Sequence, residues 1–163
     1  MDGKAVTTTV KFGNLYLGNK MTGIPYFNVP WFNETAALLR IVRGVDQVFN
    51  PAEWDVLRGF DPMACPNGTT EEATAAGFNL RAALGADWKW IADNSNGLIV
   101  GPDWHTSKGT ISEIACHQAL GLPVWEWAIF RKIFEPQTVI RPQNPDELFD
   151  TQWQFPPLAN YLI

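Results

Sequence analysis

The chain has 163 residues, of which 46% are hydrophobic and 18% are charged. This length and balance suit one domain with one hydrophobic core and exclude a disordered chain. The net charge is −5, and no run of Lys or Arg builds the basic face of a DNA or RNA binder, so a nucleic acid polymer is not an expected partner.

The same composition bears on location and on cofactors. No segment approaches the roughly 18 apolar residues of a membrane span, and the first residues lack the apolar stretch of a signal peptide. Cys65 and Cys116 lie far apart with no CxxC pattern, and there are only two His. We therefore expect a cytoplasmic protein with reduced thiols, no membrane partner and no metal site.

Strands and helices alternate along the chain. Residues 31–43, WFNETAALLRIVR, place apolar side chains at helical spacing, and residues 97–101, GLIVG, are typical of a strand buried on both faces. In chain order, the predicted elements are a strand at 12–18, a helix at 31–43, a strand at 46–49, a breaker-rich loop at 61–70, a helix at 71–94 broken near Gly77 or Gly85, a strand at 97–101, a helix at 110–120 and a strand at 122–125.

This alternation predicts an α/β three-layer sandwich, in which helices cover both faces of a parallel sheet. Right-handed crossovers then place the ligand crevice at the carboxyl edge of the sheet. We expect a single domain over residues 1–163, with a core at 12–134. Residues 135–163 are rich in Pro and Gln but still hold aromatic residues, which predicts an irregular tail packed on the body or on a neighbouring subunit.

The segment from Ser107 to Val124 holds the sharpest local pattern. Thr110 stands where an N-cap belongs, and Glu113 follows three residues later. One interpretation is a capping box, in which each side chain satisfies a free backbone N–H. The other is functional: a carboxylate in the first turn of a helix at the carboxyl edge points into the ligand crevice, where it could attack a sugar. The two interpretations are compatible.

Weaker candidates surround this segment. Gly18 and Gly23 bracket a turn after the first strand and expose backbone N–H groups that suit a phosphate or a ribose hydroxyl, although an ordinary tight loop is the simpler interpretation. Asp87 lies on a predicted helix, where a solvated face is the simpler reading. Asp103 follows a buried strand, and Ser107 could cap the helix or donate to an oxyanion.

Together, GNKMTGIPYFNVPWF, NPAE, a helix with an Asp, LIVGPDW, SKGTISEI and ALGLPV resemble uncharacterised phage and bacterial domains related to nucleoside 2-deoxyribosyltransferases. The likeness spans roughly residues 15–124. It implies a flavodoxin-like fold, a homo-oligomer of two or more subunits, and chemistry without a metal or organic cofactor. It also hints at a bacterial cytosol or the host cytoplasm of a phage.

The resemblance implies roles for individual residues. Glu113 matches the nucleophile that forms a glycosyl-enzyme intermediate, and Asp87 matches the acid that holds or protonates the base. Asn19-Lys20 replaces the family's usual Gly-Pro in the first loop. The expected substrate contacts are Gly18, Thr22, Gly23, Tyr26, Phe27, Asp103, Ser107 and Gly109.

The residue six positions before Glu113 indicates which substrate to expect. Six residues before the nucleophile, family members acting on free nucleosides carry Asp, whereas hydrolases of nucleoside 5′-monophosphates carry Ser; this chain has Ser107 followed by Lys108. A hydroxyl beside an ammonium can hold a phosphate that an Asp would repel. The expected function is cleavage or transfer of the N-glycosidic bond of a nucleoside 5′-monophosphate or nucleoside. The alternatives are a non-catalytic protein that binds or sequesters nucleotides, and a structural protein that retains the fold.

Overall fold

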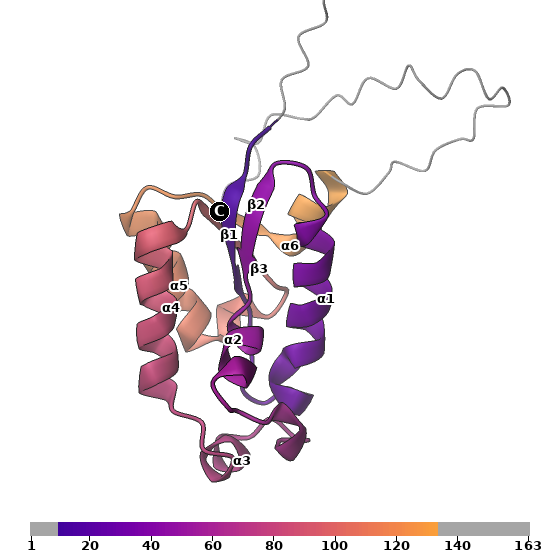
Figure 1. The fold of residues 1–163 in the computed structure, drawn as a ribbon, viewed down its shortest axis with the longest axis vertical. Coiled ribbons are helices and arrows are strands. Elements are labelled where there is room, and N and C mark those ends of the chain that lie inside the picture. Colours follow the sequence, from indigo (N-terminus) through magenta and orange to yellow (C-terminus); the bar gives the residue numbers. More distant parts are fainter. Residues whose placement is uncertain (1–9, 134–163) are drawn as a thin grey trace, which may run out of the picture.

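The computed structural model describes residues 10–133 and contains one sheet of four parallel strands (Figure 1). The strands are β1 (Gly13–Gly18), β2 (Val45–Phe49), β3 (Gly97–Val100) and β4 (Val124–Glu126). Their order is β2-β1-β3-β4, and every neighbouring pair is parallel. The predicted parallel sheet is confirmed, and each predicted strand lies within two residues of an observed one. The predicted tail at 135–163 lies outside the described residues.

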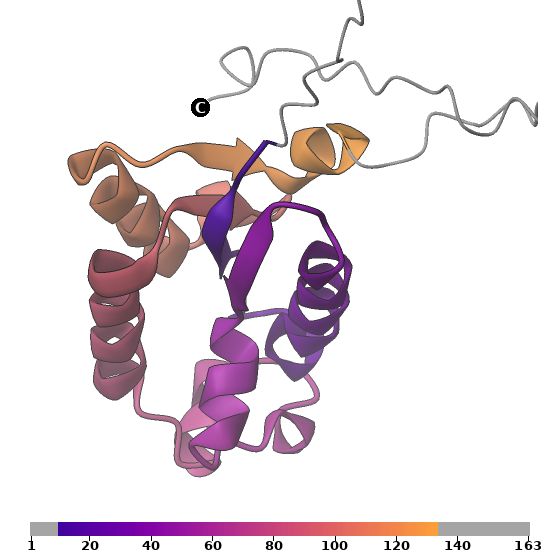
Figure 2. The same ribbon diagram turned by 45° about the horizontal axis from the view of Figure 1, so that its top comes forward.

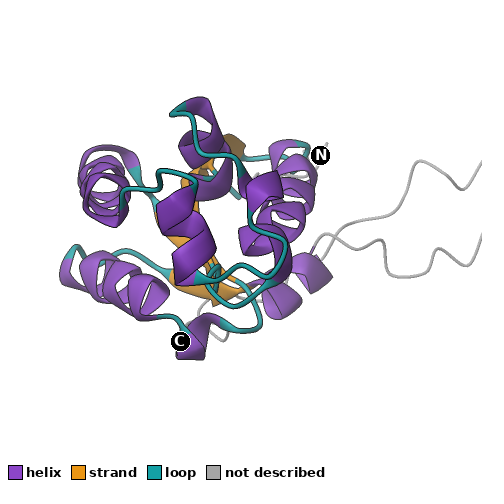
Figure 3. Ribbon diagram, turned by 90° about the horizontal axis from the view of Figure 1, so that it is seen from below, coloured by secondary structure: helices purple, strands orange, loops and turns teal. Residues whose placement is uncertain are grey.

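Helices cover both faces of the sheet, as a three-layer sandwich requires. The α-helices are α1 (Val29–Arg40), α2 (Pro51–Leu57), α3 (Thr70–Ala75), α4 (Leu80–Asn94), α5 (Lys108–Ala119) and α6 (Trp127–Phe130). Figure 2 shows α4 and α5 on one face and α1 on the other. Figure 3 looks at the carboxyl edge of the sheet, which α2 crosses. None of the helices within residues 10–133 is long and apolar enough to cross a membrane.

The core is divided by the sheet because side chains alternate along each strand. Leu15 and Leu17 of β1 are fully buried against α1, where Phe32 packs on them. Tyr16 points to the opposite face and packs with Ile91 of α4. Each fully buried side chain of this size contributes about 1.5–3 kcal/mol to stability. The face of the sheet that α4 and α5 cover therefore receives the polar side chain of Tyr16 from β1.

Several helices differ from the prediction. The helix predicted at 71–94 is divided into α3 and α4, because Gly77 adopts a φ of +79°, whereas Gly85 stays inside α4. Helix α2 was not predicted. Asn50 caps it by accepting the N–H groups of Ala52 and Glu53, and Pro51 occupies its first turn. An Asn-Pro pair that looked like the end of a strand is therefore also the start of a helix.

Candidate active site

Helix α5 begins earlier than predicted, and this changes the role available to Glu113. The N-cap is Ser107, whose hydroxyl accepts the backbone N–H of Thr110 at 3.3 Å. Thr110 is therefore inside the helix, and the expectation that it is the N-cap is wrong. Glu113 falls in the second turn, where backbone N–H groups already have helical partners. The capping box between Thr110 and Glu113 does not form, so the Glu113 carboxylate is not used to end its own helix.

The carboxylate of Glu113 is instead buried against the sheet, with the residue 6% exposed. Its Oε1 accepts a hydrogen bond from the Tyr16 hydroxyl at 3.0 Å. Its Oε2 is buried without a hydrogen-bond partner. A methyl group added at Gly18 would lie 2.9 Å from this Oε2, so the unpaired oxygen lies against the last residue of β1. A buried carboxylate oxygen without a partner is costly in a folded protein, which suits a position reserved for a ligand.

Two further carboxyl groups are buried near Glu113. Burial and, second, the neighbouring charge of Asp55 raise the pKa of Asp87 to about 7. Burial also raises the pKa of Asp55 to about 6. For Glu113, burial and then the charge of Asp87 raise the pKa to about 8. We call Tyr16, Asp55, Asp87 and Glu113 the acid cluster; acids with raised pKa values grouped at a sheet edge are typical of functional sites.

The acid cluster can hold a proton near neutral pH. The charge of Asp87 raises the pKa of Glu113, so the two titrations are coupled and the protons leave in steps that belong to the pair. Between the two steps, one acid is protonated and one is ionised, which is the arrangement that general acid and nucleophilic chemistry needs. Burial, followed by the charge of Glu113, raises the pKa of Tyr16 well above its ordinary value, so its hydroxyl stays a hydrogen-bond donor.

Aromatic rings enclose the acid cluster. The ring of Tyr16 stacks on Phe49 with centroids 5.2 Å apart, and Phe49 in turn contacts Trp90 at 4.7 Å and Trp54 at 5.8 Å. These rings pack around the Tyr16 ring, and burial is the largest cause of the raised pKa values of all four members of the acid cluster.

His117 holds the backbone of Glu113 from within α5. Its Nδ1 lies 2.8 Å from the Glu113 carbonyl, and its Nε2 lies 2.8 Å from the Ser95 hydroxyl. Because a carbonyl oxygen only accepts, Nδ1 carries the hydrogen and Nε2 accepts from Ser95. Burial lowers the pKa of His117, which favours this neutral form. The ring thereby ties α5 to the turn between α4 and β3.

The loops that follow β1 and β3 are joined at the carboxyl edge. The N–H of Gly101 donates to the carbonyl of Gly18 at 2.8 Å, and the N–H of Asp103 donates to the Asn19 side chain at 3.2 Å. Asn19 is buried and forms a structural link between these loops.

The structure brings only some of the predicted site residues together. Gly18, Asp87 and Glu113 meet at the acid cluster, while Ser107 and Gly109 form the start of α5. Asp103 is connected to the site only by the hydrogen bond from its backbone N–H to the Asn19 side chain. Within residues 10–133, no hydrogen bond joins the acid cluster to the remaining predicted contacts, Thr22, Gly23, Tyr26 and Phe27.

The first loop is instead attached to the segment before α3. The N–H of Gly23 donates to the Gly68 carbonyl at 2.7 Å, and the N–H of Tyr26 donates to the Cys65 carbonyl at 3.0 Å. Phe27 is buried in a separate core cluster, with its ring 5.5 Å from that of Phe60. The ring of Phe27 is thus used for packing, and its expected contact with the substrate has no support in this structure.

Two members of the acid cluster were not predicted as site residues. The sequence predicts Tyr16 only as part of a strand, although a Tyr between two Leu in a buried strand needs a partner for its hydroxyl. Asp55 lies on the unpredicted helix α2, so its position at the carboxyl edge could not be inferred.

The Tyr16→Phe variant tests the hydrogen bond within the cluster. Phe keeps the stacking on Phe49 but removes the hydroxyl that lowers the pKa of Glu113. The pKa of Glu113 is therefore expected to rise further, and any activity that needs the ionised form is expected to fall about 10- to 100-fold and to require higher pH. A pH–rate profile measures this. An unchanged acidic limb would contradict a role for Tyr16 in holding the carboxylate.

The fold and site define a class of protein: a parallel α/β protein with a buried group of acids at the carboxyl edge of its sheet. Among the described residues, no group of three or more His, Cys, Asp or Glu is arranged to hold a metal ion. No family model matches the chain, and no match was found among curated proteins or among solved structures.

Proposed function

We propose that this protein cleaves or transfers the N-glycosidic bond of a nucleoside 5′-monophosphate or nucleoside, with Glu113 as the nucleophile. One observation carries the proposal: Glu113 has one oxygen held by Tyr16 and the other unpaired and buried at the carboxyl edge. Glycosidic bonds break through an oxocarbenium-like transition state, which a close carboxylate stabilises by charge and by bonding.

In the first step, Glu113 Oε2 forms a bond to C1′ of the sugar as the bond from C1′ to the base breaks. The electron pair of that bond leaves with the base, and Asp87 gives its proton to a base nitrogen. In the second step, a water oxygen bonds to C1′, Glu113 leaves as a carboxylate, and Asp87 takes the water proton. A second base in place of water gives transfer instead of hydrolysis.

The mechanism needs an ionised Glu113 and a protonated Asp87. The free protein favours the reverse, because the pKa of Glu113 is about 8 and that of Asp87 is about 7. The two pKa values lie close together, so a small change in the surroundings of either acid can reverse which one holds a proton. Positive charge that develops at C1′ next to Glu113 favours the ionised form of that residue and leaves the proton on Asp87. The ionised form of Glu113 is thus favoured as the glycosidic bond breaks.

The start of α5 offers a place for a phosphate. The Ser107 hydroxyl accepts hydrogen bonds from the N–H and from the hydroxyl of Thr110, so its own hydrogen is available to donate. The exposed Lys108 follows it, and the first N–H groups of a 12-residue helix favour an anion. These features support a nucleoside 5′-monophosphate over a free nucleoside.

A panel of nucleosides and nucleoside 5′-monophosphates, assayed for release of free base, tests the proposal. The parent protein is expected to act on at least one monophosphate faster than on the matching nucleoside. Ser107→Asp keeps an acceptor for the cap but adds a negative charge, and should reduce activity on the monophosphate at least tenfold without a comparable loss on the nucleoside. Absence of base release across the whole panel would contradict the enzymatic function.

One observation favours a second function, the binding of a nucleotide without turnover. Glu113 is only 6% exposed, and hydrogen bonds join the loops above it, so a reaction requires this edge to open. A nucleotide that raises the melting temperature but is recovered unchanged would support this function.

A further inference from the structure

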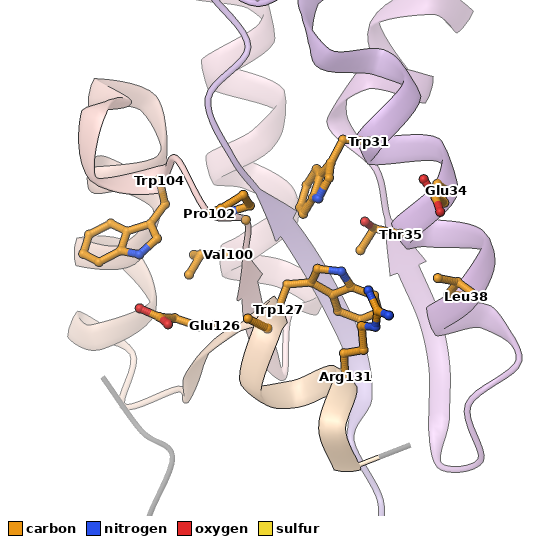
Figure 4. A pocket seen from close by; sticks show the side chains of 12 residues that line it. Trp31, Glu34, Thr35, Leu38, Val100, Pro102, Trp104, Glu126, Trp127 and Arg131 are labelled. Carbon is orange, nitrogen blue, oxygen red and sulfur yellow. The ribbon is translucent and has the colours of Figure 1, made fainter. Parts of the chain in front are cut away.

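A cavity of about 480 Å³ lies between α1, the carboxyl ends of β3 and β4, and α6 (Figure 4). No member of the acid cluster lines it. Its volume is within the range of small-molecule sites, and the carboxyl edge is where open parallel sheets bind their ligands. The cavity is therefore a second place where this fold can hold a ligand, and the side chains around it determine which chemistry suits that ligand.

The carboxylate of Glu126 lines the cavity without a partner in the fold. Glu126 is the last residue of β4 and the N-cap residue of α6, but its side chain accepts no hydrogen bond from that helix. The residue is half-buried, and the ion pairs within residues 10–133 do not include it. A partly desolvated carboxylate of this kind favours a ligand that brings a positive charge.

The other charges around the cavity agree with this preference. The lining includes two carboxylates, Glu34 and Glu126, and one guanidinium, Arg131, so it carries a net charge of −1 at neutral pH. Figure 4 shows Glu126 on the side of Trp104. Arg131 lies on the side of Trp127 in the same view. A cation between Trp104 and Glu126 is therefore close to a carboxylate, whereas the guanidinium lies toward the other end of the cavity.

Three indole rings supply the other part of a cation site. Trp31 comes from α1, Trp104 from the turn after β3, and Trp127 from the start of α6, and all three residues are half-buried. The face of an indole attracts a cation more strongly than the ring of Tyr or Phe does. An ammonium group that carries methyl groups gains in two ways, because its charge suits the indoles and its methyl groups bury apolar surface against them.

The hydroxyl of Thr35 offers the ligand a further point of attachment. Thr35 lies on α1, is only 2% exposed and lines the cavity. Among the described residues, no hydrogen bond joins its hydroxyl to another group. A hydroxyl both donates and accepts, so this one suits a hydroxyl or carbonyl group on the ligand, independently of the carboxylates.

We propose that this cavity binds a small organic cation with an alkylated ammonium group, which lies between the Trp104 indole and the Glu126 carboxylate. The net charge of the lining favours such a ligand over an anion, and the indoles favour an alkylated ammonium over a strongly hydrated inorganic ion. A neutral molecule of the same shape keeps the apolar contacts but loses both electrostatic attractions. The site is separate from the acid cluster and does not depend on Glu113.

Calorimetric titration of the full chain with choline tests the proposal. We expect saturable binding, and at least tenfold weaker binding of 3,3-dimethylbutan-1-ol, the neutral molecule in which carbon replaces the choline nitrogen. Glu126→Gln removes the charge with little change in size, and Trp104→Ala removes the indole; each should weaken choline binding about tenfold. The matched controls are Glu53→Gln and Trp88→Ala, which change residues outside the cavity and should bind choline like the parent.

Glu113→Gln separates this proposal from the enzymatic one, because it alters the acid cluster alone and should leave choline binding unchanged. Glu126→Gln is close to isosteric, so it remains informative if Trp104→Ala fails to fold. The proposal is overturned if choline does not bind, if the neutral alcohol binds within twofold of choline, if Glu126→Gln binds choline within twofold of the parent, or if Glu113→Gln abolishes binding.

Discussion

Glu113→Gln should reduce the release of free base by roughly 10⁴-fold or more. Glutamine has nearly the same size, and its carbonyl can still accept the hydrogen bond from Tyr16. An amide, however, cannot bond to C1′ as a carboxylate does, and it carries no charge to stabilise the oxocarbenium-like transition state. The variant therefore keeps the shape of the site while removing its chemistry.

Initial rates of base release, measured on the best substrate of the panel, give this comparison. The matched control is Glu53→Gln, the same chemical change at a surface residue that pairs with Arg40 on the outside of the molecule. Parent and control should agree within a few-fold. A Glu113→Gln variant that retains more than about a tenth of the parent rate is incompatible with nucleophilic attack by this residue.

The second large effect is on stability: Glu113→Gln should stabilise the protein in alkaline solution. The pKa of Glu113 is raised from 4.5 to about 8 in the folded state. The stabilisation that this neutral group provides is complete below pH 4.5 and is lost as the pH rises to about 8. Above that range, the folded protein holds a buried anion close to Asp87. Because Gln cannot ionise, the variant should gain on the order of 3 kcal/mol relative to the parent between about pH 4.5 and about pH 9.

Urea denaturation at these two pH values measures the change in the free energy of unfolding. Glu53→Gln is again the control, and it is expected to lower the free energy of unfolding instead of raising it. Hydrogen bonding from Arg40 lowers the pKa of Glu53, so Glu53 contributes stability above its unfolded pKa that the variant loses. Since Glu53 is partly exposed, this loss should be small. If Glu113→Gln gains no stability relative to the parent at alkaline pH, Glu113 is not the strained, buried acid described above.

A gain in stability by Glu113→Gln would show that burial of the Glu113 carboxyl group costs stability in the parent protein. A buried acid with an unpaired oxygen lowers stability, and proteins tolerate this cost mainly where the group is used. The expected pair of results, higher stability together with lost activity, distinguishes a functional carboxylate from one that only supports the fold.

The sheet could be predicted because its signals are local. The run GLIVG between two glycines and the alternation of strands with helices each reflect short stretches of sequence. Boundaries were less secure where two signals competed. Ser107 and Thr110 are both good N-caps, and choosing Thr110 placed Glu113 in a first turn that it does not occupy.

The acid cluster could be predicted only in part, because its contacts join distant parts of the chain. Tyr16 and Glu113 are 97 positions apart, so no local pattern links them. Asp87 looked like a residue on a solvated helix face, and only the packing of α4 against the sheet shows that it is buried. The family resemblance pointed to Glu113 and Asp87 individually, whereas the raised pKa values of both acids follow from their burial in the fold.

The most direct test of the central claim is to look for the covalent intermediate. The protein is mixed with its best substrate, quenched in acid during the first turnovers, digested and analysed by mass spectrometry. The account predicts that the peptide containing Glu113 gains the mass of the sugar, with its phosphate where the substrate has one, and that this adduct is absent from Glu113→Gln. Release of base with no adduct, or with the adduct on another residue, would contradict it.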